Sequence, residues 1–140
     1  MTNRKLAYII KDQKPLVLSA SETVQQACRH MRERRVGSAL VIDDQRRLAG
    51  IFTGRDAVRL LAEGNNAAQT PLARAMTPNP ITITPDARAI DALRAMSDGG
   101  FRHLPVLEEG RLWGIVSRGD FTGMEIDRLD EETHLWECIR

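Results

Sequence analysis

The sequence predicts an α+β fold of two pseudo-symmetric repeats, each a strand, a helix, two strands and a helix, packed together as one module. The segment 50–56, Gly-Ile-Phe-Thr-Gly-Arg-Asp, returns at 114–120 as Gly-Ile-Val-Ser-Arg-Gly-Asp, and we call these segments the signatures. Upstream, Ala27, Arg29, Met31 and Val41 recur 65 positions later as Ala92, Arg94, Met96 and Val106. A chain of 140 residues with 42% hydrophobic content can bury one shared core but is short for two. We therefore expect one domain.

Each repeat opens with a short extended run, at 16–18 and at 81–83. A helix is predicted after each run, because apolar residues recur at i, i+3, i+4 and i+7 and so share one face. These residues are Val24, Ala27, Cys28 and Met31 in the first repeat, and Ala89, Ala92, Leu93 and Met96 in the second. The pattern predicts that both faces point into the core.

Polar residues before these helices predict where they start. Ser19 and Glu22 have the spacing of a capping box, and Thr84 followed by Pro85 fits a cap and a first helical position. Within the first helix, Cys28 is expected to be a small core residue.

A β-hairpin is predicted after each first helix. Apolar runs at 39–42 and 104–107 are each followed by a polar turn and a second run, at 48–53 and 112–117. The spacing between the repeats changes from 65 to 64 within this turn, which is where a one-residue difference is best tolerated.

A second helix is predicted beyond each signature aspartate, and in the first repeat it ends near Gly64. Residues 71–76 can add one helical turn before the second copy. We thus expect a first repeat over 1–64 with an N-terminal extension, a linker over 65–80, a second repeat over 81–124 and a tail over 125–140.

The two signatures, of the form Gly-Ile-x-Thr/Ser-x-x-Asp, are accompanied by Ala-x-x-x-Met on each first helix. Met76-Thr77-Pro78 precedes the second copy, and Arg102-His103-Leu104-Pro105-Val106 opens its hairpin. With these motifs, nearly the whole chain resembles a tandem pair of cystathionine-β-synthase (CBS) domains, called a Bateman module. The resemblance implies a regulatory binding module with two clefts between the repeats, where adenosine-containing ligands bind.

In that family the carboxylate that closes the signature accepts hydrogen bonds from the ribose 2′- and 3′-hydroxyls. The resemblance gives this role to Asp56 and Asp120. Its physical basis is independent of the family, because an ionised carboxylate has two acceptor oxygens spaced for a cis-diol. Each such charge-assisted bond contributes roughly 1.5–3 kcal/mol.

Other signature residues are candidates for contact with the ribose or a phosphate. The hydroxyls of Thr53 and Ser117 lie at the predicted strand ends, and the amides of the helix start that follows attract phosphate. Arg55 and Arg118 can neutralise phosphate, but they occupy different positions in the two signatures. We therefore expect the two clefts to differ.

The resemblance also implies that each cleft combines the signature of one repeat with the first strand and hairpin start of the other. For the Asp56 cleft, these contributions are Thr82, Ile83, Arg102, His103 and Leu104. For the Asp120 cleft, they are Leu18, Ser19, Gly37, Ser38 and Ala39. Arg102 and His103 resemble the family's phosphate-contacting pair, whereas the first repeat has glycine and serine there. Backbone groups at these strand ends can read the adenine edge.

The ligand is expected to be AMP, ADP or ATP, with S-adenosylmethionine and NADH as further adenosine-containing choices and no cofactor required. A homodimer and an unidentified target protein are the expected partners. The tail can cover a dimer partner or pack on its own domain. The alternative function is a ligand-independent dimerisation or docking scaffold, in which Asp56 and Asp120 only cap helices, a role that contributes about 1 kcal/mol.

The remaining sequence features exclude other classes of function. There is no Walker-type phosphate loop, dinucleotide fingerprint or metal-ligand spacing, so we expect neither an enzyme nor a metal site. The net charge is +1 and the basic cluster at 29–35 is interrupted by Glu33, so we do not expect nucleic acid as a partner. Without an apolar run of about 18 residues, we expect a soluble, cytoplasmic protein with free thiols.

Overall fold

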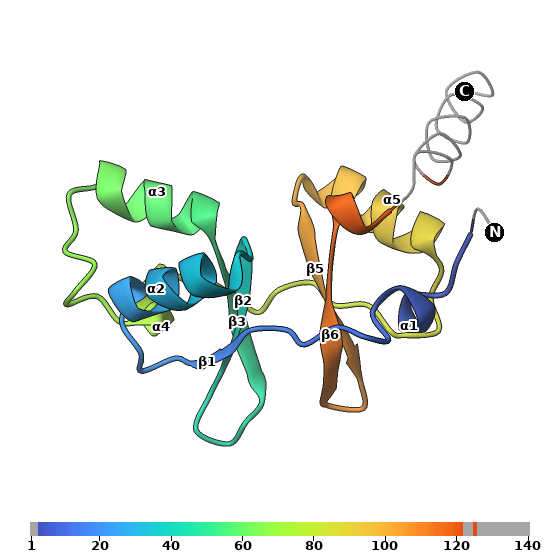
Figure 1. The fold of residues 1–140 in the computed structure, drawn as a ribbon, viewed down its shortest axis with the longest axis horizontal. Helices are drawn as coiled ribbons and strands as arrows, with labels where there is room; N and C mark the ends of the chain where they lie inside the picture. The colour runs from blue at the N-terminus through green and yellow to red at the C-terminus, as the bar shows by residue number, and fades with distance from the viewer. Residues whose placement is uncertain (1–2, 122–124, 126–140) are drawn as a thin grey trace. The chain divides into compact units, whose positions relative to one another are not determined.

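The computed structural model describes residues 3–121 and Glu125, and these form two compact units (Figure 1). Residues 14–81 form one unit, and residues 3–13 form the other together with the described residues from 82 onward. The N-terminal extension therefore belongs with the second repeat, and the expected linker over 65–80 belongs with the first. Of the expected tail, all but Glu125 lies outside the described residues.

The unit of the first repeat contains a mixed sheet with helices around it. Its elements are β1 (Val17–Ser19), α2 (Val24–Arg34), β2 (Ser38–Ile42), β3 (Leu48–Thr53), α3 (Gly54–Ala62), α4 (Leu72–Ala75) and β4 (Thr77–Pro78). The strand order is β1-β2-β3-β4, with β1 parallel to β2 and the other pairs antiparallel. The predicted strand, helix, hairpin, helix and single helical turn are all confirmed.

The second repeat's unit contains the same hairpin and first helix. Its elements are α1 (Leu6–Ile9), α5 (Ala89–Gly99), β5 (His103–Glu108), β6 (Arg111–Ser117) and the 3₁₀ turn η1 (Arg118–Asp120). The predicted strand at 81–83 is reduced to a single parallel bridge between Ile83 and Val106. The helix predicted beyond Asp120 lies outside the described residues, apart from Phe121 and Glu125.

The one-residue difference between the repeats lies in the hairpin turn, as predicted. Five residues, 43–47, separate the paired Ile42 and Leu48, whereas four, 108–111, separate Leu107 and Leu112. The strands on either side therefore keep the same register in both repeats.

Both predicted helix starts were wrong. Thr23 caps α2: its hydroxyl accepts the Gln26 N–H at 3.2 Å, and the Gln26 side chain accepts the Thr23 N–H at 2.9 Å. The Glu22 carboxylate instead accepts the Ser19 N–H at 2.9 Å, in the turn after β1. The chain turns at residues 20–21, and the Glu22 carbonyl then accepts a bond from the N–H of Leu72, the first residue of α4, so α2 begins only after Thr23.

In the second repeat, α5 starts at Ala89 rather than near Thr84 and Pro85. Its N-cap is Arg88, whose N–H donates to the Asp91 carboxylate at 2.9 Å. Here too the chain makes a turn, at residues 85–86, and an outside segment bonds to it at the helix start, since the Ala89 N–H donates to the Arg4 carbonyl at 2.8 Å.

The segment that precedes each repeat packs in the unit of the other repeat, and we call residues 3–13 and 70–78 the leading segments. In the first repeat's unit, the N–H groups of Leu72 and Ala73 donate to the carbonyls of Glu22 and Ala20. In the second, the N–H groups of Leu6 and Ala7 donate to the carbonyls of Ala87 and Pro85. The same pair of bonds thus attaches both leading segments.

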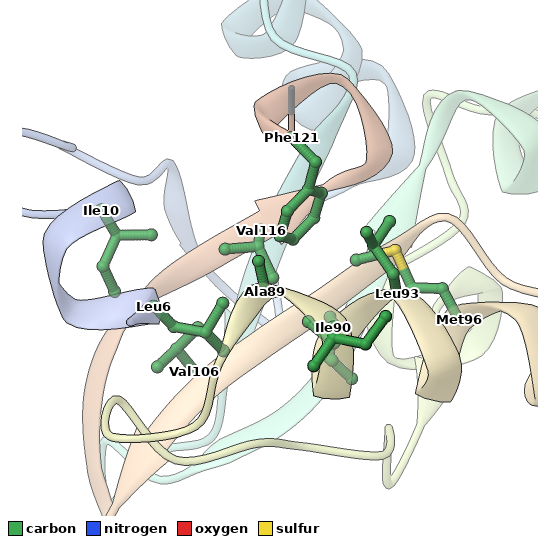
Figure 2. Close-up of a cluster of buried hydrophobic side chains, with 11 residues drawn as sticks. Leu6, Ile10, Ala89, Ile90, Leu93, Met96, Val106, Val116 and Phe121 are labelled. Atoms are coloured by element: carbon green, nitrogen blue, oxygen red, sulfur yellow. The ribbon is translucent and has the colours of Figure 1, made fainter. Parts of the chain in front are cut away.

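Each unit has its own cluster of buried side chains, and the leading segments contribute to both. The first cluster contains Leu16, Leu18, Val24, Ala27, Met31, Ala39, Val41, Phe52, Leu60, Leu72 and Ala75. The second, shown in Figure 2, contains Leu6, Ile10, Ala89, Ile90, Ala92, Leu93, Met96, Leu104, Val106, Val116 and Phe121. The predicted helix faces are confirmed except at Cys28, which is only half-buried against the first cluster.

The first glycine of each signature lies where a leading segment crosses the hairpin. A Cβ on Gly50 would lie 2.6 Å from the Met76 sulfur and 2.7 Å from the Thr77 carbonyl oxygen. A Cβ on Gly114 would lie 2.5 Å from Oε1 of Gln13, whose amide bonds both backbone groups of Ile115. Gln13 therefore occupies the edge of β6 as β4 occupies the edge of β3.

We expect Gly50→Ala to lower the free energy of unfolding by about 1–3 kcal/mol, because the new methyl meets the paired backbone of β4. Gly114→Ala is the matched control, and its cost should be smaller because the contact is with the end of a side chain that can rotate. Urea unfolding followed by circular dichroism measures both values. Equal losses of unfolding free energy in the two variants would contradict the expectation that the β4 backbone resists the new methyl group more than the Gln13 side chain does.

Candidate functional site

The signature of the first repeat forms a strand-to-helix turn, with Thr53 ending β3 and Gly54 starting α3. Asp56 is 6% exposed, and its Oδ2 accepts bonds from the N–H of Thr53 at 2.9 Å and its hydroxyl at 3.2 Å. The other oxygen, Oδ1, pairs with the guanidinium of Arg59 at 3.2 Å. That guanidinium also donates to the Ala75 carbonyl in α4 at 3.0 Å. Both oxygens of Asp56 are therefore engaged.

The second signature repeats this turn with one difference. Oδ2 of Asp120 accepts bonds from the N–H of Ser117 at 2.7 Å and its hydroxyl at 3.3 Å. Asp120 is exposed, and within the described part of the chain its Oδ1 has no hydrogen bond or ion pair. In the sequence, Gly123 stands where the first repeat has Arg59, so no cationic side chain occurs at that position.

These contacts revise the capping alternative. The N-caps are Thr53 and Ser117, and each aspartate is the third residue of the helical turn, where it accepts the N–H of the cap. A carboxylate oxygen can accept two hydrogen bonds, so Oδ2 is filled in both repeats. Oδ1 of Asp120 can accept two more, whereas Oδ1 of Asp56 already holds Arg59. An aspartate can thus support the helix start through Oδ2 and bind a diol through Oδ1. Asp120 has more acceptor positions left for a diol than Asp56.

The residues that open each hairpin lie beside the signature of their own repeat. Ser38 pairs with Thr53, and His103 pairs with Ser117 in the same register. Equivalent backbone hydrogen bonds also occur in the two repeats. The N–H of Gly54 donates to the Gly37 carbonyl and that of Arg118 to the Arg102 carbonyl, both at 3.2 Å. Leu104 and Ala39, the next residues along, are buried.

The partners expected from the opposite repeat belong to the other unit. Leu18 and Ile83 are equivalent in the two units, because Leu18 pairs with Val41 and Ile83 with Val106. The sequence grouped these residues, Ser19, Thr82 and both hairpin starts with the signature of the opposite repeat, and that grouping stays a prediction. Within each unit, the hairpin start lies beside the signature of its own repeat, so Arg102 lies beside the Asp120 signature.

Three arginines at the signatures and hairpin starts are candidates for an anionic group. Arg55 and Arg102 are exposed and Arg118 is half-buried. Among the described residues, none of their side chains has a hydrogen bond or an ion pair. Their charge is thus open to a ligand phosphate.

His103 contributes less charge than its sequence position suggests. Burial lowers the pKa of His103 below the ordinary value of 6.5; the charge of Asp120 opposes this shift and that of Arg102 adds to it. The imidazole is therefore mainly neutral at pH 7. Of the expected basic pair, Arg102 carries the charge.

The lowered pKa of His103 predicts how stability depends on pH. As pH falls through 6.5, the unfolded chain takes up this proton before the folded chain does, so the free energy of unfolding should decrease. The decrease should level off below the folded-state pKa. Denaturant unfolding between pH 5 and about 7.5 measures it, and His103→Gln should have a flatter profile. Identical profiles would contradict the assignment.

Sequence reasoning missed two arginines that contact the signatures. Arg59 had a detectable signal, because it stands three residues after Asp56 on a predicted helix. Arg4 had none, because its contacts with Asp120 and Glu125 join residues more than 110 positions apart. Asp56 and Arg59 also line a pocket of about 110 Å³ between α3 and α4.

The described residues also bear on a metal site and on a membrane span. Within 3–121 and Glu125, no group of three histidine, cysteine, aspartate or glutamate side chains is arranged to hold a metal ion. In the same part of the chain, no helix is both long and apolar enough to cross a membrane.

Comparisons with known proteins were made for sequence and for structure. The family model of the CBS domain matches residues 9–63 and again 72–124. The CBS domain-containing protein CBSCBSPB5 of Arabidopsis thaliana is 42% identical over 127 residues, which cover 90% of this chain and 23% of that protein. This chain spans about a fifth of the length of CBSCBSPB5 and of the related plant protein CBSCBSPB2.

Two solved structures show the same fold. A CBS domain protein from Pyrobaculum aerophilum, complexed with AMP, has a TM-score of 0.82 at 21% identity and covers 91% of this chain and 99% of its own. The CBS domain pair of protein MJ0100, in complex with 5′-methylthioadenosine and S-adenosyl-L-methionine, has a TM-score of 0.76 at 22% identity. It covers 93% of this chain and 98% of its own.

Proposed function

Because the chain belongs to the CBS domain family and carries two of these domains in tandem as a Bateman module, we propose that it senses an adenosine-containing nucleotide and signals to a partner protein. The structures with the same fold support this, since one is a complex with AMP and the other a complex with 5′-methylthioadenosine and S-adenosyl-L-methionine. In this proposal the chain is a regulatory binding module of the cytoplasm and not an enzyme, and it needs no cofactor.

One observation carries the proposal for this chain: among the described residues, the exposed carboxylate of Asp120, which ends η1, has an oxygen with both acceptor positions open. A ribose offers two adjacent hydroxyl donors, which match the two acceptor positions of this oxygen. The bonds would be charge-assisted and therefore strong for their size.

The charge beside Asp120 favours a ligand with phosphate. The backbone bond between Arg118 and Arg102 places these two residues next to each other, and neither side chain is paired within the described residues. Guanidinium groups bind phosphate through two parallel hydrogen bonds. We therefore favour AMP, ADP or ATP over S-adenosylmethionine, with NADH as a phosphate-bearing alternative.

A homodimer is part of the proposal. Val58 and Leu61 lie one turn apart on α3 and are 67% and 68% exposed. Apolar side chains this exposed on one helix face favour an interface. Sedimentation equilibrium measures the mass, and Leu61→Glu should shift a dimer toward the monomer. The target protein that reads the ligand state is a further, unidentified partner.

A ligand-independent docking scaffold is the second candidate. It is favoured by the observation that the hydrogen bonds at the start of α3 are complete without a ligand. A scaffold would keep its dimer and partner affinity unchanged whatever nucleotide is added. A sensor requires that the ligand bind one state of the module more tightly than another.

The experiment that tests the proposal is equilibrium dialysis of the wild-type chain against AMP, ADP, ATP, S-adenosylmethionine and NADH. We expect saturable binding of at least one phosphate-bearing ligand. Guanosine and cytidine monophosphates are the controls for the base. A folded chain that binds none of the five would reject the sensor and leave the scaffold.

A further inference from the structure

The N-terminal leading segment is joined to the second signature by one side chain, that of Arg4. Its guanidinium donates through Nη2 to Oε1 of Glu125 at 2.7 Å and through Nε to Oε2 at 3.2 Å. The same Nη2 donates to the main-chain carbonyl of Asp120 at 3.1 Å. Arg4 therefore contacts both the residue that closes the signature and a residue five positions further on.

This contact is built as a buried, two-bond ion pair. The side chain of Glu125 is fully buried and that of Arg4 is 21% exposed. The hydrogen bond with Glu125 raises the pKa of Arg4, with burial opposing the shift. Removing one partner of such a pair leaves a buried charge uncompensated, so the arrangement resists rearrangement.

The Asp120 carbonyl is a sensitive place to hold the signature. η1 has only three residues, 118–120, and its hydrogen bonds are weaker than those of an α-helix. The carboxylate of Asp120 is exposed, and within the described residues the hydrogen bonds to it come from Ser117 alone. A bond to the Asp120 carbonyl therefore limits rotation of the very residue whose side chain has to meet the ligand.

The first repeat provides an independent case of the same link. There Arg59 pairs with the Asp56 carboxylate and donates to the Ala75 carbonyl in the other leading segment. The two arginines lie on different elements. Arg59 lies on the helix that follows the signature, whereas Arg4 lies in the leading segment. A leading segment is thus attached to a signature through a guanidinium in both units.

We propose that Arg4 is the positioning residue of the adenosine site in the second repeat, and that through it residues 3–13 hold Asp120 in the orientation that accepts the ribose hydroxyls. This inference rests on the proposed function and adds a residue far from the signatures in sequence. It makes the N-terminal segment a part of the site, so that displacing the segment lowers affinity for the ligand.

The test uses Arg4→Met in the otherwise wild-type chain, and the binding that Asp120→Asn removes is taken as binding at the second repeat. We expect affinity for AMP to fall roughly tenfold, the equivalent of one hydrogen bond to a charged group. The ratio of affinities for AMP and its 2′,3′-dideoxy analogue should also fall, because a loosened carboxylate loses its preference for the diol. If Arg4 only stabilised the fold, Arg4→Met would lower the affinity for both ligands equally and leave this ratio unchanged.

Arg88→Met is the matched control. Arg88 attaches the same leading segment by donating to the Asn3 carbonyl at 3.2 Å, but no bond joins it to Asp120. The affinity of Arg88→Met for AMP should stay within about twofold of that of the parent protein. A twofold change corresponds to less free energy than one hydrogen bond to a charged group contributes. Equal losses in both variants would overturn the role of Arg4 and assign the effect to general anchoring of the segment.

Hydrogen exchange separates failure of this inference from failure of the proposed function. The Ser117 amide donates to Asp120, so it should exchange faster in Arg4→Met than in Arg88→Met, with or without ligand. Wild type that binds no nucleotide would reject the proposed function. An unchanged exchange rate at Ser117 would overturn the positioning role even if nucleotides bind.

Discussion

Replacing Leu6 with alanine is expected to lower the free energy of unfolding by about 2–5 kcal/mol, one of the two largest effects that the structure predicts. Leu6 stands before the first repeat in the sequence, yet its side chain is completely buried in the core of the second repeat's unit (Figure 2). The substitution removes three buried carbons and leaves a cavity between α1 and the hairpin, which cannot fully collapse.

Tyr8→Ala is the matched control on the same short helix. Tyr8 is 57% exposed, so its loss should cost about 1 kcal/mol or less. Guanidinium unfolding of both variants, followed by circular dichroism, gives the two values. Similar costs would mean that α1 does not pack into the second core as the structure shows.

The second large effect concerns ligand binding. Asp120→Asn should weaken AMP binding at the second repeat by roughly 100-fold, because neutralising the carboxylate weakens two charge-assisted bonds to the ribose. The amide oxygen can still accept the Ser117 N–H, so the turn should keep its shape. Titration calorimetry against wild type, with the unfolding midpoint as a check on folding, measures the change.

Asp56→Asn is the comparison in the first repeat. Oδ1 of Asp56 is already paired with Arg59, so fewer acceptor positions are open to a diol. The loss of affinity should therefore be smaller than for Asp120→Asn. Equal losses would show that the ligand displaces Arg59 from the carboxylate, and unchanged binding in both variants would contradict the role of the aspartates.

Much of the fold could be predicted because its signals are local or repeated. Periodicity identified the faces of α2 and α5, and alternation with turn residues identified both hairpins. The repeat also located the one-residue difference in the turn between Ile42 and Leu48. These features depend on residues that lie close together in the sequence.

The errors share a physical cause, the leading segments. Ser19 with Glu22, and Thr84 with Pro85, fit helix starts by local rules, but the chain beyond them bonds to residues about 50 or more positions away. With those bonds the chain makes a turn before Thr23 and before Arg88, and each helix begins only after that residue. No local pattern indicates which distant segment will take these N–H and carbonyl groups.

The candidate site was predictable to a similar degree. The signature aspartates and their hydroxyl partners followed from the repeat, and the structure adds hydrogen bonds between them that spacing alone did not establish. The contrast between a paired Asp56 and an open Asp120 depends on Arg59 and on the glycine that replaces it. Arg4 was beyond prediction, since its contacts cross from one end of the chain to the other.

The most direct test of the sensor is calorimetric titration of the wild-type chain with AMP and, separately, with its 2′,3′-dideoxy analogue. We expect saturable binding of AMP and a loss of roughly 100-fold in affinity when both hydroxyls are removed, matching the loss in Asp120→Asn. Equal affinity for the two ligands would contradict it, because a site built on the signature carboxylate has to distinguish a ribose with its diol from one without.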